Sequence, residues 1–220
     1  MPALRHRPDG DCLHVSTSQI TGYIPDDWQV SFCKFSASRS NHGVYLNELA
    51  DSWFVACESS ENAGDNWYCN YGTNTRFLGC KGENSKTGNG WHLGGLGSGE
   101  VIELTGCTSQ LNNENGFLFD NSGVGGALGT YTLTGCRSWR DGRARTYGYA
   151  AFSSAGCRSR IVGTGCVTSP DSIGTDYGAM ETAGSYGMCF TGSYLAGTAA
   201  ATYDDGSNTH ALLHQSPVPF

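Results

Sequence analysis

The chain has 220 residues, including 32 glycines, 6 prolines and 10 cysteines, and its formal net charge is −7. This length suffices for one buried core, and the many glycines with only 15% charged residues favour an all-β fold over exposed helices. The acidic balance argues against nucleic acid and anionic membranes as partners, because both bind basic faces, and no stretch reaches the about 18 apolar residues that span a bilayer.

The first segment, residues 1–27, lacks the pattern that dominates the rest of the chain. It opens with MPALRHRPDGDCLH, which has two arginines but no apolar run, so it does not predict a secretory signal. Leu13, Val15, Ile20 and Tyr23 occur there without the paired patterns. We therefore expect synthesis in the cytoplasm, and a cap over the first unit of the fold, since an open solenoid end exposes edge strands.

Two short apolar patterns alternate through residues 28–192. The first ends on a cysteine, at intervals of 24, 23, 27, 29 and 30 residues: Cys33, Cys57, Cys80, Cys107, Cys136 and Cys166. The second follows nine to twelve residues later, starting at Gly43, Asn66, Gly90, Gly116, Gly148 and Gly178. Polar, turn-forming residues separate the two patterns. Because a unit this short cannot bury its apolar face alone, the repeat predicts a right-handed parallel β-helix of about six to seven coils, with two strands per coil about 4.8 Å apart.

Alternation along a strand assigns the faces of the first pattern. Residues three and five positions before each cysteine are expected inside, including Trp28 and Val30 in the first coil. The residues four positions before are expected outside, facing solvent or a neighbouring subunit: Gln29, Trp53, Arg76, Glu103, Thr132 and Val162. The cysteines form an inward column, which we expect to be a ladder of free thiols, although the spacing would also permit disulfides. Neither paired CxxC motifs nor clustered histidines predict a metal site.

With its paired registers, T-G-C followed by glycine, aromatic and aliphatic residues, the chain resembles the pectate-lyase-like superfamily of parallel β-helices over residues 28–192. It is most similar to the β-helical modules of bacteriophage tailspikes and tail fibres. That resemblance implies a homotrimer on a virion, attached to other virion proteins and contacting a bacterial surface polysaccharide. The catalytic motifs of pectate lyases and polygalacturonases are not found in this chain. The final segment, residues 193–220, is expected to cap the stack or to pack against another subunit.

The second pattern provides candidate glycan-binding residues. If the first and third residues after its leading glycine or asparagine face inward, the second and fourth form outer columns: Tyr45, Tyr68, His92, Asn47, Asn70 and Asp120. Aromatic side chains beside amides and carboxylates suit sugars, which offer both apolar C–H faces and hydroxyl groups. Two alternatives remain open. The asparagines could form a structural amide ladder, and a shift of register by one residue would bury both columns.

The sequence supports catalytic acids less strongly than it supports glycan-binding residues. Glycoside hydrolysis needs two carboxylates about 5–9 Å apart, and the candidates are Asp120, Glu181 and Glu48, followed by Glu103 and the pair Asp204–Asp205. Asp120 and Glu181 lie two coils apart, which corresponds to roughly 10 Å along the stack. No cofactor is predicted.

Six arginines near the end of the repeat are the one basic concentration in the sequence: Arg137, Arg140, Arg143, Arg145, Arg158 and Arg160. They could bind acidic sugars or serve a lyase, but solvated turns or salt bridges are the simpler expectation. The sequence thus favours a non-enzymatic, virion-type structural or adhesive protein. A polysaccharide-degrading lyase or hydrolase on the same scaffold is the alternative, and a free-standing binding solenoid is a third possibility.

Overall fold

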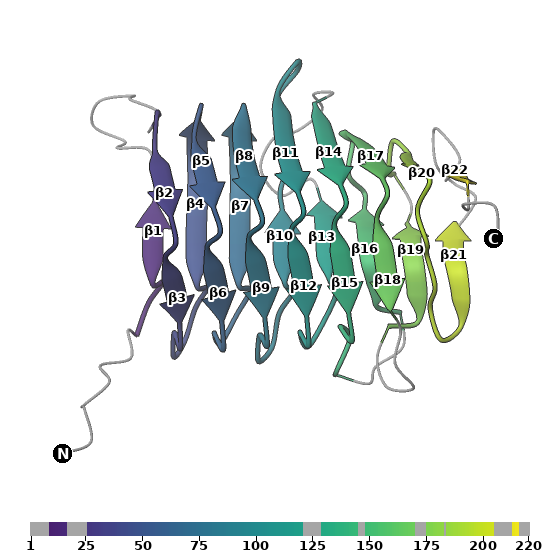
Figure 1. The fold of residues 1–220 in the computed structure, drawn as a ribbon, viewed down its shortest axis with the longest axis horizontal. Helices are drawn as coiled ribbons and strands as arrows, with labels where there is room; N and C mark the ends of the chain where they lie inside the picture. The colour runs from purple at the N-terminus through teal and green to yellow at the C-terminus, as the bar shows by residue number, and fades with distance from the viewer. Residues whose placement is uncertain are drawn as a thin grey trace.

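The repeat folds as a parallel β-solenoid of about six turns in the computed structural model. The structure describes residues 9–16, 26–120, 129–144, 148–169, 175–182, 184–204 and 213–215, and these residues contain strands but no helix. Figure 1 shows the strands side by side along the long axis, with successive turns stacked from the N-terminal to the C-terminal end. The predicted all-β solenoid is confirmed. Among the described residues there is no helix long and apolar enough to cross a membrane.

Three parallel sheets form the faces of the solenoid. Sheet A contains the second pattern, in β1 (Leu13–Val15), β4 (Val44–Ala50), β7 (Trp67–Thr73), β10 (Trp91–Leu93), β13 (Phe117–Asp120), β16 (Ala150–Ala155), β19 (Tyr177–Glu181) and β21 (Ala200–Asp204). Sheet B contains the first pattern, in β2 (Gln29–Ser31), β5 (Trp53–Val55), β8 (Thr75–Leu78), β11 (Val101–Thr105), β14 (Thr130–Thr134), β17 (Arg160–Thr164), β20 (Met188–Thr191) and β22 (Leu213–Gln215). The segments before and after the repeat, residues 1–27 and 193–220, therefore also contribute strands: β1 and β21 join sheet A, and β22 joins sheet B.

Sheet C was not anticipated, because the sequence analysis placed only polar turns after each cysteine. It contains β3 (Lys34–Ser36), β6 (Glu58–Ser60), β9 (Lys81–Glu83), β12 (Thr108–Gln110), β15 (Arg137–Trp139) and β18 (Val167–Ser169). Phe35 of β3 packs against the core, but from β6 onward the inward residues are small, such as Ser59 and Ser109. At Gly82 an added Cβ would lie 2.6 Å from the carbonyl oxygen of Gly90. The chain turns too tightly here for a large side chain, so no hydrophobic pattern marks the strand.

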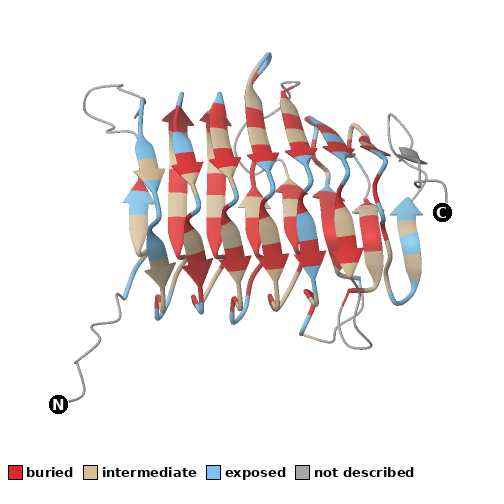
Figure 2. Cartoon of the chain, viewed as in Figure 1, coloured by how far each residue is buried: buried red, intermediate tan, exposed pale blue. Residues whose placement is uncertain are grey.

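The core is a set of stacked side chains in register along the axis. Trp67 and Trp91 stack at 4.9 Å, and Phe117 and Phe152 extend the same column at 5.9 and 5.0 Å. Figure 2 shows this burial continuing along the turns and declining at β1 and β21. The predicted inward residues are buried from the second cysteine unit onward. The prediction for Trp28 is wrong, since it is 38% exposed: β2 ends sheet B, so no described strand packs on its outer side.

The glycine of the T-G-C motif has a conformational role. Gly106 and Gly135 have φ of 62° and 61°, in the left-handed region, where the chain turns from sheet B into sheet C. Ala56 holds the same corner in an earlier turn with φ of 50°. Left-handed backbone costs an L-residue roughly 1–2 kcal/mol, so glycine is favoured at this corner.

Substitution at this corner should change stability in opposite directions at the two positions. We expect Gly106→Ala to lower the free energy of unfolding by about 0.5–1 kcal/mol, because the roughly 1–2 kcal/mol of left-handed strain exceeds the roughly 0.5–1 kcal/mol that alanine recovers in chain entropy. The added Cβ meets no atom within 4 Å, so only the backbone conformation is penalised. Ala56→Gly should raise the free energy of unfolding slightly, since the strain removed exceeds the roughly 0.5–1 kcal/mol entropic cost of glycine. Urea denaturation of both variants measures the two changes in the free energy of unfolding. Changes of the same sign would contradict the conclusion that backbone strain at this corner favours glycine.

Candidate functional site

The outer face of sheet A carries the predicted columns. Tyr45, Tyr68 and His92 are direct neighbours in successive strands, and Asn47 pairs with Asn70. Each is half-buried, while the residues between them in β4 and β7 are buried. The alternation predicted for this pattern is therefore confirmed, and the one-residue shift that would have buried the columns does not occur.

The aromatic rings of this face stack on one another along the solenoid axis. His14 lies against Tyr45 at 4.6 Å, and Tyr45 stacks on Tyr68 at 5.2 Å with their planes 5° apart. His92 then meets Tyr68 edge-on at 4.5 Å. The ring faces are thus occupied by neighbouring rings, and an external ligand would contact ring edges and hydroxyl groups rather than stack on an open face.

His92 lies between two carboxylates from neighbouring turns. Its Nδ1 is 3.1 Å from Oδ2 of Asp65, and its Nε2 is 2.8 Å from Oδ2 of Asp120. The side chains of His92 and Asp65 are 15% and 9% exposed. Both ring nitrogens can donate to a carboxylate only when the imidazole is protonated. The geometry therefore favours an imidazolium bridging two acids.

The pKa values agree with this arrangement. Burial alone lowers the pKa of His92, but the hydrogen bonds with Asp120 and Asp65 outweigh it and raise the pKa to about 9. Burial also acts to raise the pKa of Asp65, yet the hydrogen bond and charge of His92 hold it below its usual value. At neutral pH the three residues therefore form a cation shared by two anions.

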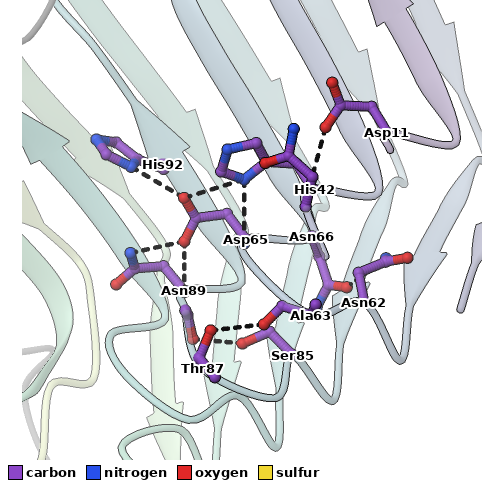
Figure 3. Close-up of polar contacts among 12 residues, drawn as sticks. Asp11, His42, Asn62, Ala63, Asp65, Asn66, Ser85, Thr87, Asn89 and His92 are labelled. Carbon is purple, nitrogen blue, oxygen red and sulfur yellow. Dashed lines mark hydrogen bonds and ion pairs between the residues drawn. The ribbon is translucent and has the colours of Figure 1, made fainter. Parts of the chain in front are cut away.

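A second histidine and another acid extend the network toward the N-terminal end (Figure 3). The amide of Asp65 donates to Nδ1 of His42 at 3.2 Å, and the amide of His42 donates to Oδ1 of Asp11 at 3.0 Å. Oδ2 of Asp11 is 2.8 Å from Nδ1 of His14. Burial lowers the pKa of His42. Its neutral ring can accept the Asp65 amide proton, so this histidine differs in charge from His92.

The polar residues continue as a ladder at the corner that precedes sheet A. Oδ1 of Asp65 accepts hydrogen bonds from the amide and side chain of Asn89, at 2.6 and 2.9 Å. Oδ1 of Asn89 does the same for Asn115, and Oδ1 of Asn115 accepts from the amide of Ala150. Each side chain thus satisfies the backbone of the next turn.

Asp11, His42 and Asp65 were missed in the sequence analysis. A signal was present for Asp65, because Asp65, Asn89 and Asn115 each stand two residues before a buried aromatic residue. His42 precedes Val44 by the same interval. Its role is harder to foresee, because a histidine does not conform to the aspartate and asparagine pattern of the column.

The asparagine column also behaves as a ladder. Nδ2 of Asn70 donates to Oδ1 of Asn47 at 2.9 Å. This pairing uses one amide proton and one carbonyl group of the two side chains. Both asparagines lie on the outer face, next to the tyrosines in the same two strands, β4 and β7.

The candidate catalytic acids do not converge. Asp120 faces outward and binds His92, whereas Glu181 is fully buried in the interior. The two residues belong to different columns, because Asp120 pairs with Ala155 while Glu181 pairs with Ser154. Glu48 is half-buried at a left-handed position, φ 59°, within β4. Glu103 forms an ion pair with Arg76 at 2.9 Å. Asp204 ends β21, and Asp205 lies outside the described residues.

The residues of the predicted outer column of sheet B and the arginines near the end of the repeat contact different neighbours. Arg76 also lies over the ring of Trp53 at 4.9 Å, so this column is paired within the chain. Arg137 is on sheet C and Arg160 on sheet B. Arg140 and Arg160 lie over Trp139 and Tyr186, Arg143 donates to Asn84, Arg158 is exposed, and Arg145 lies outside the described residues. The five arginines that the structure describes therefore do not form one basic patch.

No protein-family model, curated protein or solved structure matches this chain. Within the described ranges, no group of three or more histidine, cysteine, aspartate or glutamate side chains is arranged to hold a metal ion. The site is therefore defined by its own geometry: stacked aromatic rings, paired amides and a protonated histidine between two carboxylates.

Proposed function

We propose that this protein is a non-enzymatic β-solenoid that binds an extended polysaccharide along the outer face of sheet A. The observation that carries the proposal is the regular register of Tyr45 on Tyr68 beside Asn47 on Asn70. Hydroxyl, amide and aromatic groups repeat there at the strand spacing of about 4.8 Å. A polymer of sugars offers hydroxyl groups at a comparably regular interval, and half-buried amides and ring edges suit them.

The protonation of His92 supports binding over cleavage. A general base needs a free lone pair near neutral pH, whereas both nitrogens of His92 contact carboxylates and its pKa is about 9. Asp120 bonds to this histidine and Glu181 is inside the core. Among the described residues, no two of the candidate acids Glu48, Asp120 and Glu181 face each other across the outer surface, as a glycosidase requires.

The wider biological role follows from the sequence resemblance. We include in the proposal that the solenoid acts as a spike, fibre or decoration subunit of a virion, as a homotrimer joined to other virion proteins, with a bacterial surface polysaccharide as ligand. Light scattering of the reduced protein tests the assembly. We expect a mass of three chains. The mass of a monomer would contradict the proposed trimer but would not bear on polysaccharide binding.

The binding proposal is tested with immobilised O-antigen and capsular polysaccharide fragments, both neutral and acidic. We expect the double variant Tyr45→Phe/Asn47→Ala to bind about 5- to 150-fold more weakly than wild type, since two hydrogen bonds of roughly 0.5–1.5 kcal/mol each are lost. Phenylalanine keeps the ring stack intact. The matched control is Tyr194→Phe, at an exposed tyrosine outside sheet A, which should bind normally.

Two results would overturn this proposal. Equal affinity of the double variant and wild type would place the ligand elsewhere or nowhere on this face. Release of new reducing ends or unsaturated sugars by the wild-type protein would favour the polysaccharide-degrading alternative.

A further inference from the structure

The cysteines at the corner between sheets B and C form a regular column. Backbone hydrogen bonds keep them in register. The backbone amide of Glu58 donates to the carbonyl oxygen of Cys33, and the backbone amide of Lys81 donates to that of Cys57, both at 2.9 Å. Every thiol in the column contacts the carbonyl oxygen two residues before it, at 3.4–3.9 Å: Cys33, Cys57, Cys80, Cys107, Cys136 and Cys166. The six side chains thus share one orientation, and their sulfur atoms follow one line.

The thiols are oriented toward the preceding turn. Sγ of Cys57 lies 3.5 Å from the carbonyl oxygen of Val30, and Sγ of Cys80 lies 3.3 Å from that of Phe54. The same contact recurs in the next three turns, at 3.3, 3.4 and 3.8 Å. With this repeat, neighbouring sulfur atoms are separated by about the strand spacing of 4.8 Å.

The surroundings of the column are apolar and uncharged. All ten cysteines of the chain are free thiols, and those of the column are buried except for Cys33 at its N-terminal end. The electrostatic neighbours of Cys80 and Cys107 are other cysteines and backbone carbonyls, with no histidine or carboxylate among them. Burial raises the pKa of the Cys107 thiol well above its usual value. Hydrogen bonds from neighbouring cysteine thiols lower the pKa of Cys80 and of Cys136. The column is therefore a row of sulfur ligands that interact with one another in a soft environment.

We propose that this column binds soft monovalent metal ions, Cu(I) or its heavier congener Ag(I), each held by two sulfur atoms, with the first ion between Cys33 and Cys57. An ion midway between sulfurs about 4.8 Å apart lies about 2.4 Å from each, close to the about 2.3 Å of metal–thiolate bonds. Thiolate ligands select Cu(I) over harder ions.

Charge balance favours a monovalent ion. One thiol loses its proton and forms a metal–sulfur bond, while the second sulfur donates a lone pair as a thiol, so one proton is released for each ion bound. The net charge at the site is unchanged, which avoids the cost of placing an uncompensated charge in the core. No oxidation or reduction is involved. A divalent ion such as Zn(II) would bring excess charge and require about four ligands, and the column offers two.

The open end provides the route of entry. Cys33 is exposed, whereas Cys57 directly behind it is 1% exposed. An incoming ion would first meet Cys33 and then the thiol of Cys57.

The test uses the full-length, reduced protein titrated with Ag(I), with native mass spectrometry, proton release and thiolate–metal charge-transfer absorbance as readouts. We expect about one proton per ion, retention of the β-sheet circular dichroism spectrum, and no binding of Zn(II) under the same conditions. Cys33→Ser should weaken binding of the first ion by at least about 10–100-fold. Because Cys33 is exposed, this variant is expected to fold. The matched control is Cys189→Ser, at a half-buried cysteine outside the column.

Three outcomes would overturn the proposal. The first is equal Ag(I) affinity for Cys33→Ser and wild type. The second is an effect of Cys189→Ser as large as that of Cys33→Ser. The third is loss of the β-sheet spectrum as metal is taken up, which would mean that the thiols bind only after unfolding.

Discussion

Replacing Trp91 with alanine is expected to lower the free energy of unfolding by about 3–5 kcal/mol. Trp91 is fully buried, stacked between Trp67 and Phe117, and packed edge-on against Phe77 at 5.3 Å. Its indole N–H also donates to the carbonyl oxygen of Thr108 at 3.1 Å. The substitution would leave a cavity in the middle of a rigid stack, where neighbouring turns cannot collapse into the space.

Urea denaturation followed by circular dichroism measures this effect, with Trp53→Ala as the matched control. Trp53 is 41% exposed on sheet B, and its main contact is the guanidinium of Arg76 over the ring. Exposed cation–π pairs contribute roughly 0.5–1 kcal/mol, so the control should lose about that much. Equal losses for the two variants would contradict the assignment of the Trp67–Trp91 column as the core.

Raising the pH through 9 is expected to remove about 3 kcal/mol of stability that depends on His92. The pKa of this imidazole is raised from the usual 6.5 to about 9 by its hydrogen bonds with Asp120 and Asp65, which outweigh burial. A group with a raised folded-state pKa contributes fully below its unfolded pKa. Its contribution is lost as the pH rises through the folded value, so the window lies between about pH 6.5 and 9.

The same series of unfolding measurements on His92→Gln isolates the contribution of this histidine. Glutamine can donate to one carboxylate but carries no charge, so the variant should be less stable than wild type at pH 6. The difference should shrink toward pH 9.5. Ionisation of cysteine thiols in the unfolded chain also lowers stability at alkaline pH, but it affects both proteins equally. A difference independent of pH would show that His92 is not protonated in the folded protein.

The solenoid could be predicted from the amino-acid sequence alone. Cysteines at regular intervals and aromatic residues at a second register recur because each turn must place an apolar residue directly over that of the turn before. This requirement is visible in the printed chain, as with Phe54 over Phe77 and Trp67 over Trp91. The outward columns followed from the same alternation, which is why Tyr45, Tyr68 and His92 were placed correctly.

The contacts between side chains of different turns could be identified only in the folded structure. Sheet C went unrecognised because, after Phe35 in its first strand, its inward positions are small polar residues or glycine, selected by a close approach of the chain rather than by hydrophobicity. The grouping of Asp65, His92 and Asp120 spans 27 and 28 residues of sequence. Asp65 occupies a recurrent position, but the contact of its carboxylate with His92 depends on side-chain directions that the repeat does not specify. The exposure of Trp28 depends likewise on the position of β2 at the end of sheet B, because no described strand of that sheet packs on its outer side.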